Sequence, residues 1–259
     1  MRFAVIGGTG FYDFLTGEVT HHEVSTRYGA VQVDAGDVSG AEVYFLPRHG
    51  PEHSLPPHRV NYRANIAALQ QLGVRNVLAS AAVGSMAETL PPGSLALLTQ
   101  FLDFTRCRAA TFFDGDEGVV HTDMGSPYCP HLGGELRAAA AALGERLSPD
   151  TTYVCAEGPR FETPAEIRMF RQLGGDVVGM TSVPEVVLAR EAGLCYASVA
   201  IVTNWAAGIA PEPLRHEEVS SFMSEQAPRL VRVFQAVIRA HLEIECATCR
   251  GGAAHDAGG

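Results

Sequence analysis

The stretch 195-CYASVAIVTNWAAG-208 decides the fold class, because an unbroken apolar run leads into a threonine and an asparagine. A central strand of a parallel sheet reads as such a run, since both of its faces are buried. In open α/β sheets, ligands bind beyond the carboxyl ends of the strands. Asn204 therefore either caps a turn or contacts a ligand, and the rest of the sequence must decide between these roles.

Strand-like runs alternate with helical patterns along the whole chain. Strands are expected over 2–7, 30–36, 42–49, 76–83, 94–104, 152–158, 176–180 and 195–204. Amphipathic helices are expected over 61–73, 131–147, 164–174, 184–193 and 217–245. The segment 20-THHEVSTRYG-29 is not expected to be a clean strand. Alternating βα units predict a largely parallel sheet with helices on both faces, built as one domain over 1–245 with a disordered tail over 246–259.

The composition excludes several classes of protein. The 259 residues are 46% hydrophobic and 19% charged, as in a globular domain, and the net charge is −10 without a basic block. This charge argues against a nucleic acid or an anionic membrane as a partner. The opening MRFAVIGGTG runs directly into an apparent strand, without the pattern of a targeting segment, so a cytoplasmic protein is expected.

The six cysteines are expected to be reduced core residues. They are scattered in apolar context, apart from the lone CxxC formed by Cys246 and Cys249. One such pair supplies only half of a zinc site, so no metal is expected.

Polar and small residues stand at several expected strand exits. The turn 5-VIGGTGF-11 can cradle phosphate with its N–H groups, although many Gly-rich turns are only tight turns. It lacks both the dinucleotide fingerprint and the GK[ST] of a Walker loop. In 46-LPRHGPEH-53, Arg48 and His49 can bind an oxyanion or form surface salt bridges. In 157-EGPRFETPAE-166, Phe161 and Glu162 can face a planar ring, or pack in the core and favour a helix start.

Together these motifs closely resemble the trimeric purine nucleoside phosphorylase and methylthioadenosine phosphorylase family over residues 2–240. The resemblance rests on IGGTGF, RHG with the following VNY, EGPRFET, the VPEV and TN motifs, and HEEV at 216–219. It implies a single-domain, three-layer α/β/α sandwich with a mixed central sheet, and a homotrimer with active sites near subunit interfaces. It also implies reversible cleavage of a purine N-glycosidic bond by inorganic phosphate, a co-substrate, without a cofactor.

The resemblance also implies site residues. Those expected to bind phosphate are Thr9, Arg48, His49, His53, Ala82 and Thr181. Those expected to bind the nucleoside are Ala81, Phe161, Glu162, Met180, Asn204, Ala206 and His216, with His121 reaching a neighbouring subunit's sugar pocket. The catalytic roles are expected to fall to Asn204, Glu162 and His53.

Two positions indicate which base is cleaved. Adenine-directed members read TD.D at this strand exit, whereas this chain has Asn204 and Ala206 in place of both carboxylates. An asparagine amide can donate to purine N7 or to a 6-oxo oxygen, and Glu162 can accept the N1–H that hypoxanthine has and adenine lacks. The expected substrates are therefore inosine, guanosine and their deoxy forms.

The 5′ substituent and the reaction class have alternatives. His216 in HEEV either favours a substrate with a 5′-hydroxyl or is only a surface residue at a helix start. The apolar segment 205-WAAGIAPEPL-214 could instead contact a 5′-methylthio group, which leaves S-methyl-5′-thioinosine or methylthioadenosine as alternative substrates. A nucleosidase would use an aspartate near N7 and no anion site. A non-catalytic purine-binding module would have a broken phosphate site, and a nicotinamide-dependent oxidoreductase would carry the missing fingerprint.

Overall fold

The fold is described by a computed structural model that covers residues 2–8, 10–11, 14–50, 54–115, 118–210, 216–240, 246 and 249. The side chains of residues 216–218 are not part of this description. None of the helices within these ranges is both long and apolar enough to cross a bilayer.

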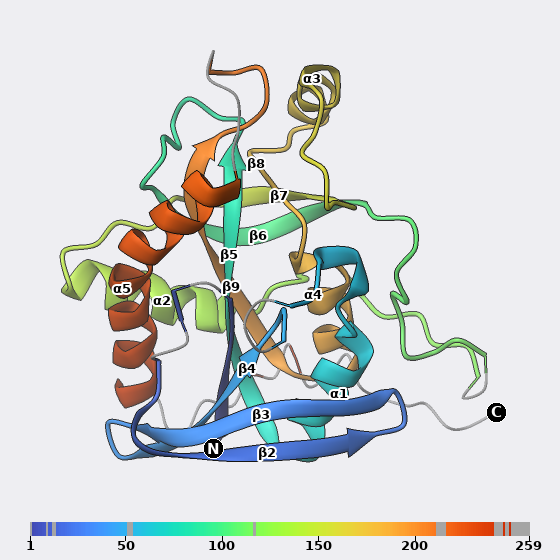
Figure 1. The fold of residues 1–259 in the computed structure, drawn as a ribbon, viewed down its shortest axis with the longest axis vertical. Coiled ribbons are helices and arrows are strands. Elements are labelled where there is room, and N and C mark those ends of the chain that lie inside the picture. The colour runs from blue at the N-terminus through green and yellow to red at the C-terminus, as the bar shows by residue number, and fades with distance from the viewer. Residues whose placement is uncertain are drawn as a thin grey trace.

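The described strands form one mixed sheet in the order β2-β3-β4-β1-β5-β8-β7-β6-β9 (Figure 1). Their bounds are β1 Arg2–Gly7, β2 Thr16–Thr26, β3 Gly29–Val38, β4 Ala41–Pro47, β5 Val74–Ser85, β6 Leu95–Phe104, β7 Thr151–Ala156, β8 Val177–Gly179 and β9 Cys195–Trp205. Because β9 pairs with both β6 and β5, the strands β5, β8, β7, β6 and β9 close into a ring. The last residues of β5 therefore lie between β8, which runs antiparallel to them, and the end of β9, which runs parallel.

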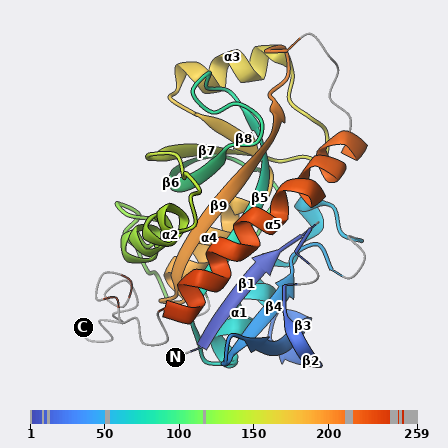
Figure 2. The same ribbon diagram turned by 90° about the vertical axis from the view of Figure 1, so that its left-hand side faces the viewer.

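Helices cover both faces of the sheet, as the alternating pattern predicts. Their bounds are α1 Tyr62–Gln71, α2 Pro130–Ala142, α3 Pro164–Gln172, α4 Ser182–Glu191 and α5 His216–Ala240. One apolar cluster joins α1 and α4 to the sheet, and a second joins α2 and α5 to its other face (Figures 1 and 2). The α/β fold with a mixed central sheet is thus confirmed.

Two parts of the chain differ from the sequence-based expectation. The segment 16–26 is a regular strand, β2, paired antiparallel with β3 although nearly all of its side chains are exposed or half-buried. The apolar alternation that marks a strand fails here because neither face of β2 is well covered. Cys246 and Cys249, which fall in the expected tail, are 6% and 2% exposed within the cluster of α2 and α5.

A register shift between β5 and β9 orients the end of the opening stretch. Val83 pairs with Val202 and Gly84 with Asn204, so Thr203 is an extra residue on β9. The Thr203 Oγ1 lies 3.2 Å from the Val83 carbonyl oxygen, across the shift. Such a bulge bends the strand and re-aims the side chains that follow it. Here it brings Asn204 to the cavity described next.

Candidate active site

A cavity of about 470 Å³ lies where several strands end. Its walls come from Gly8 after β1, from Arg48 and His49 after β4, and from the carboxyl-terminal halves of β5, β8 and β9. This is the ligand position expected of an α/β sheet.

The cavity brings together most of the residues singled out from the sequence. Those that line it are Arg48, His49, Ala81, Ala82, Phe161, Glu162, Met180, Thr181, Asn204 and Ala206. Thr9, His53 and the side chain of His216 lie outside the described residues. His121 is exposed and does not line this cavity, so its contact with a neighbouring subunit stays a prediction.

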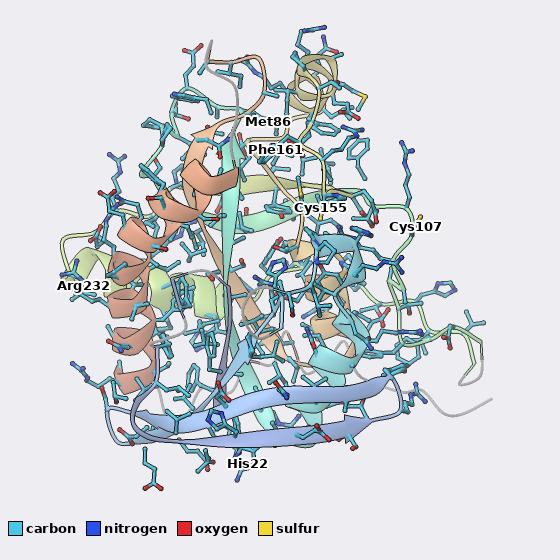
Figure 3. All side chains as sticks on the ribbon, in the orientation of Figure 1. His22, Met86, Cys107, Cys155, Phe161 and Arg232 are labelled. Carbon is cyan, nitrogen blue, oxygen red and sulfur yellow. The ribbon has the colours of Figure 1, made fainter. Side chains whose placement is uncertain are left out.

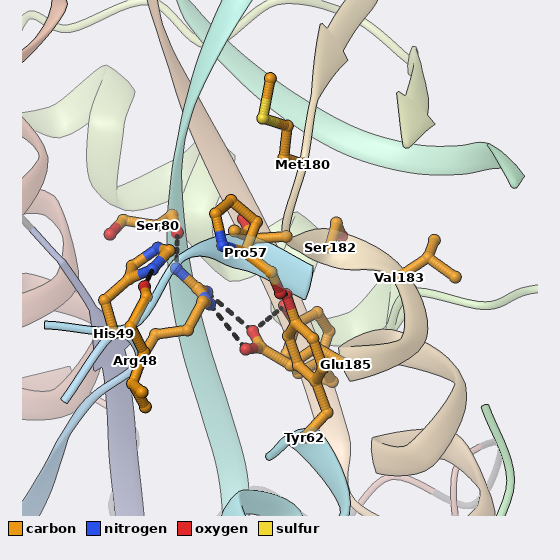
Figure 4. A network of polar contacts seen from close by, with 12 residues as sticks. Arg48, His49, Pro57, Tyr62, Ser80, Met180, Ser182, Val183 and Glu185 are labelled. Carbon is orange, nitrogen blue, oxygen red and sulfur yellow. Dashed lines mark hydrogen bonds and ion pairs between the residues drawn. The ribbon is translucent and has the colours of Figure 1, made fainter. Parts of the chain in front are cut away.

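Arg48 is held by a buried carboxylate and not by surface salt bridges. Its Nε and Nη2 donate to the two carboxylate oxygens of Glu185 at 2.6 and 2.7 Å, and its Nη1 donates to the Ser80 carbonyl at 2.8 Å (Figure 4). Burial alone would lower the pKa of Arg48, but the Glu185 carboxylate outweighs that effect and raises it. A guanidinium has five N–H groups, so two remain for an anion in the cavity. The two-pronged face of Arg48 therefore binds Glu185 and is not available to a ligand.

His49 and the start of α4 add further groups to the same wall. The His49 Nδ1 lies 2.8 Å from the Leu55 carbonyl, which fixes the ring with Nδ1 as the donor. Thr181 is the N-cap residue of α4, and its side chain makes no capping hydrogen bond. The N–H groups of Thr181 and Ser182 donate to the Tyr153 hydroxyl at 3.0 and 3.4 Å. The hydroxyl of Thr181, which lines the cavity, is therefore the group that this helix start offers to a ligand.

Glu162 is a buried carboxylate that the protein itself leaves incompletely paired. It is 8% exposed, and its Oε1 has no hydrogen-bond partner among the described residues. The helix start is capped instead by Thr163 and Glu166, and Arg160 is bound by Glu166 at 2.7 and 2.8 Å. Burial accordingly raises the pKa of Glu162 above its ordinary value. Glu162 is thereby excluded as the residue that caps the start of α3. A hydrogen-bond donor from a ligand would pair with its Oε1 and remove the cost of leaving this oxygen unpaired.

Asn204 presents an amide whose orientation is fixed on both sides. Its Oδ1 accepts from the Thr203 hydroxyl at 2.8 Å, and its Nδ2 donates to the Trp205 carbonyl at 2.8 Å. One N–H of Nδ2 is left over. A Cβ on Gly84 would lie 3.1 Å from this nitrogen, so glycine keeps the space beside the amide open. Asn204 thus offers a single oriented donor.

Phe161 and Met180 supply apolar surface for a planar group. Both line the cavity, and Figure 3 shows Phe161 toward the end of the molecule where β5 finishes. The Met180 sulfur packs over Gly158, where a Cβ would approach it to 2.5 Å. Phe161 is half-buried, which favours ring contact over the core role.

Arg108 organises this wall, and no motif in the sequence indicated it. Its guanidinium donates to the carbonyls of Met180 at 2.8 Å, Val183 at 2.7 Å and Glu157 at 2.7 Å. It also lies over the Tyr62 ring, 5.5 Å from the centroid. One buried side chain therefore ties the 157–161 loop to the start of α4. Glu185, also unassigned, stands in the VPEV motif, where it could have been noticed.

We expect Arg108→Met to disturb the site through these carbonyls. Loss of one buried partner leaves acceptors unsatisfied, each costing about 1–3 kcal/mol, so unfolding by urea should show a loss of at least about 2 kcal/mol. Arg232→Met, on an exposed side chain, is the control. Equal stability of the two variants would show that the carbonyls find other donors.

The fold is a mixed α/β sheet, and its cavity places Arg48, His49 and Thr181 together with Phe161, Glu162 and Asn204. The chain belongs to the phosphorylase superfamily, whose pattern it matches over residues 2–239. A relative from Moorella thermoacetica, a probable 6-oxopurine nucleoside phosphorylase, is 56% identical over 89% of both chains. The 6-oxopurine nucleoside phosphorylase of Pyrococcus furiosus is 50% identical over 92% of both. The methylthioadenosine phosphorylase of Schistosoma mansoni with adenine superposes with a TM-score of 0.91 at 34% identity, over 97% of this chain and 95% of the other.

Proposed function

We propose that this protein catalyses the reversible phosphorolysis of 6-oxopurine nucleosides, including inosine, guanosine and their deoxy forms, to the free base and ribose 1-phosphate or its deoxy form. The observation that carries the proposal is the unpaired, buried Oε1 of Glu162 in a cavity that also holds the Asn204 donor. A 6-oxopurine offers an N1–H for the first and an N7 or O6 acceptor for the second.

The residues divide the chemistry between two ends of the cavity. Phosphate bound by the remaining Arg48 donors, His49 and the Thr181 hydroxyl attacks the anomeric carbon as the bond to purine N9 breaks. The sugar passes through an oxocarbenium-like state, as in other glycosyl transfers. Negative charge then develops on the departing base, where the Asn204 donor stabilises it. Thr9 and His53 are proposed to complete the phosphate site.

The anion wall separates phosphorolysis from the alternatives. A nucleosidase would place an aspartate where Asn204 stands and would not need Arg48, His49 and Thr181 on one wall. The test is release of base from inosine and adenosine, each with and without inorganic phosphate. Phosphate-dependent release of hypoxanthine with adenosine nearly inert is expected, whereas release without phosphate would identify a nucleosidase. Cleavage of neither nucleoside would leave a 5′-methylthio substrate or a binding module.

Asn204→Asp should shift the base preference toward 6-aminopurines. A carboxylate can accept from a 6-amino group, and it loses the donor that a 6-oxo oxygen requires. We expect the ratio of kcat/KM for inosine over adenosine to fall at least about a hundredfold, since sites built on hydrogen bonds discriminate strongly. Asn204→Ala serves as the control that removes the amide without supplying an acceptor. An unchanged ratio in Asn204→Asp would show that Asn204 does not contact the base.

The rate of inosine cleavage should depend on the ionisation of Glu162. Accepting N1–H needs the carboxylate, and burial raises the pKa of Glu162. Activity should therefore be present above this raised pKa and be lost as the pH falls through it, at a higher pH than for an exposed glutamate. The pH profile of kcat/KM measures this. In Glu162→Gln the acid limb due to this group should disappear, and an identical limb in both proteins would assign it elsewhere.

A 5′-methylthio substrate is the second candidate. Leu55, Val219 and Met223 line the cavity with Met180 and give it an apolar portion suited to a thioether. The side chain of His216 would instead favour a 5′-hydroxyl. Comparing kcat/KM for inosine and S-methyl-5′-thioinosine decides between them, and methylthioadenosine tests the base at the same time.

We further propose a cytoplasmic homotrimer in which His121 completes the site of a neighbouring subunit. Val119, two residues earlier, is 82% exposed, and so is available for a contact between subunits. Light scattering of the purified protein would measure the assembly, and a monomer with full activity would remove His121 from the site.

A further inference from the structure

Four cysteines from three separate parts of the chain meet at one buried point. Cys129 is the N-cap residue of α2, Cys195 is the first residue of β9, and Cys246 and Cys249 follow α5. All four are buried, with 2% to 6% of their surface exposed. The start of β9 and the carboxyl end of α5 lie at the same end of the molecule (Figure 2).

The spacing of the sulfur atoms is that of a tetrahedral metal site. All four Sγ atoms lie within 4.8 Å of one another. The Cys129–Cys246 and Cys246–Cys249 separations are 3.8 and 3.7 Å. With a Zn–S bond of about 2.3 Å, the edge of a regular tetrahedron of sulfurs is about 3.8 Å. A disulfide requires about 2.05 Å, and all four cysteines are free.

We propose that Cys129, Cys195, Cys246 and Cys249 bind one zinc ion as a closed tetrathiolate site. Zinc favours four-coordinate tetrahedral sites with soft ligands, and a complete set of four protein ligands characterises structural sites and not catalytic ones. Binding replaces the proton of each thiol by a bond to the metal and releases the protons to solvent, without any change in oxidation state.

The surroundings can support the negative charge of such a site. The Leu132 N–H donates to the Cys129 sulfur at 3.5 Å, at the positive end of α2. The Cys129 N–H donates to the Tyr196 carbonyl at 2.7 Å, which holds α2 against the start of β9 beside Cys195. Backbone hydrogen bonds thus place two of the ligands independently of any metal. The four cysteines belong to the buried apolar cluster that also includes Leu132, Leu136 and Val237.

The site is remote from the cavity. Cys195 begins β9 and Asn204 stands near its other end, and nine residues of strand span about 30 Å. Zinc would therefore not act on the substrate. It would cross-link Cys246 and Cys249, beyond α5, to the start of α2 and the start of β9, which are distant from them in the sequence.

Metal content of the full chain tests the assignment first. The protein is purified under reducing conditions without chelator, and its metals and free thiols are counted. We expect about one zinc per chain and, after removal of zinc, thiolate-to-metal absorption when Co²⁺ is added to the reduced protein. Iron at the same stoichiometry would overturn the choice of metal. A metal-free protein that takes up neither Zn²⁺ nor Co²⁺, or two disulfides detected by mass, would overturn the site.

Substitutions locate the metal. Cys249→Ser should lower the zinc content at least about tenfold and lower the midpoint of thermal unfolding, since one ligand of a closed site is lost. Cys107→Ser is the matched control, because Cys107 is exposed and lies outside the cluster (Figure 3). Chelator should destabilise the wild-type and Cys107→Ser proteins but not Cys249→Ser. Zinc retained in Cys249→Ser would contradict the proposal.

Discussion

Glu162→Gln should lower kcat/KM for inosine about a hundredfold or more while making the unliganded protein more stable near neutral pH. The variant replaces a carboxylate acceptor by an amide, and hydrogen bonds to charged groups in closed sites contribute about 1.5–3 kcal/mol or more. The buried Oε1 has no partner among the described residues, so the free protein loses no internal bond there.

The gain in stability follows from the raised pKa of Glu162. Because burial raises it, the folded state holds this proton more tightly than the unfolded chain does. At a pH below the pKa that Glu162 has in the unfolded chain, the carboxyl is protonated in both states and stability is highest. As the pH rises through the raised pKa of the folded state, the buried carboxyl ionises and this stability is lost. Glutamine does not ionise, so Glu162→Gln avoids this loss of stability. We therefore expect that the wild-type protein is less stable than the variant because its carboxylate is kept for binding.

Steady-state kinetics and urea unfolding at several pH values measure both effects. Glu23→Gln, on exposed β2, is the control for the change in charge. The KM for phosphate should change little in either variant. Equal losses toward inosine and phosphate, or reduced stability of Glu162→Gln, would assign Glu162 a structural role.

Arg48→Met should lower stability by about 3–5 kcal/mol, in addition to weakening the use of phosphate. Glu185 is fully buried, and it would be left as an uncompensated charge; breaking a buried pair from one side costs about that much. The Tyr196 hydroxyl, 2.7 Å from the carboxylate, cannot replace a cation. Chemical denaturation measures the stability, and the KM for phosphate reports on the site.

The double variant Arg48→Met/Glu185→Gln separates the two roles of Arg48. Glutamine removes the orphaned charge and keeps an acceptor for Tyr196, so at least half of the lost stability should return. Phosphate use should remain impaired, because the remaining guanidinium donors are still missing. Recovery of both would show that Arg48 acts only through the fold, and recovery of neither would show that the pair cannot be replaced by neutral groups.

Much of the fold could be predicted from local patterns, and the departures have physical causes. The buried strands and the four helices with Pro, Gly or capping punctuation follow from apolar spacing, which is a property of the chain itself. β2 could not be recognised, because its side chains are nearly all exposed or half-buried and its pairing with β3 supplies the order. The closed ring of strands also has no local signature, since it depends on β9 pairing with both β5 and β6.

The sequence by itself determined the α/β class and most of the cavity wall, because strand exits converge at one edge of a sheet. It also determined the chemical types at Glu162 and Asn204, on which the proposed choice of a 6-oxopurine over adenine rests. Only the tertiary structure decided that Arg48 is bound by Glu185, that Arg108 fixes three carbonyls, and that four scattered cysteines meet. These contacts join residues that are far apart in the chain, and burial determines which charged groups pair. Spacing along the sequence shows neither the contacts nor the burial.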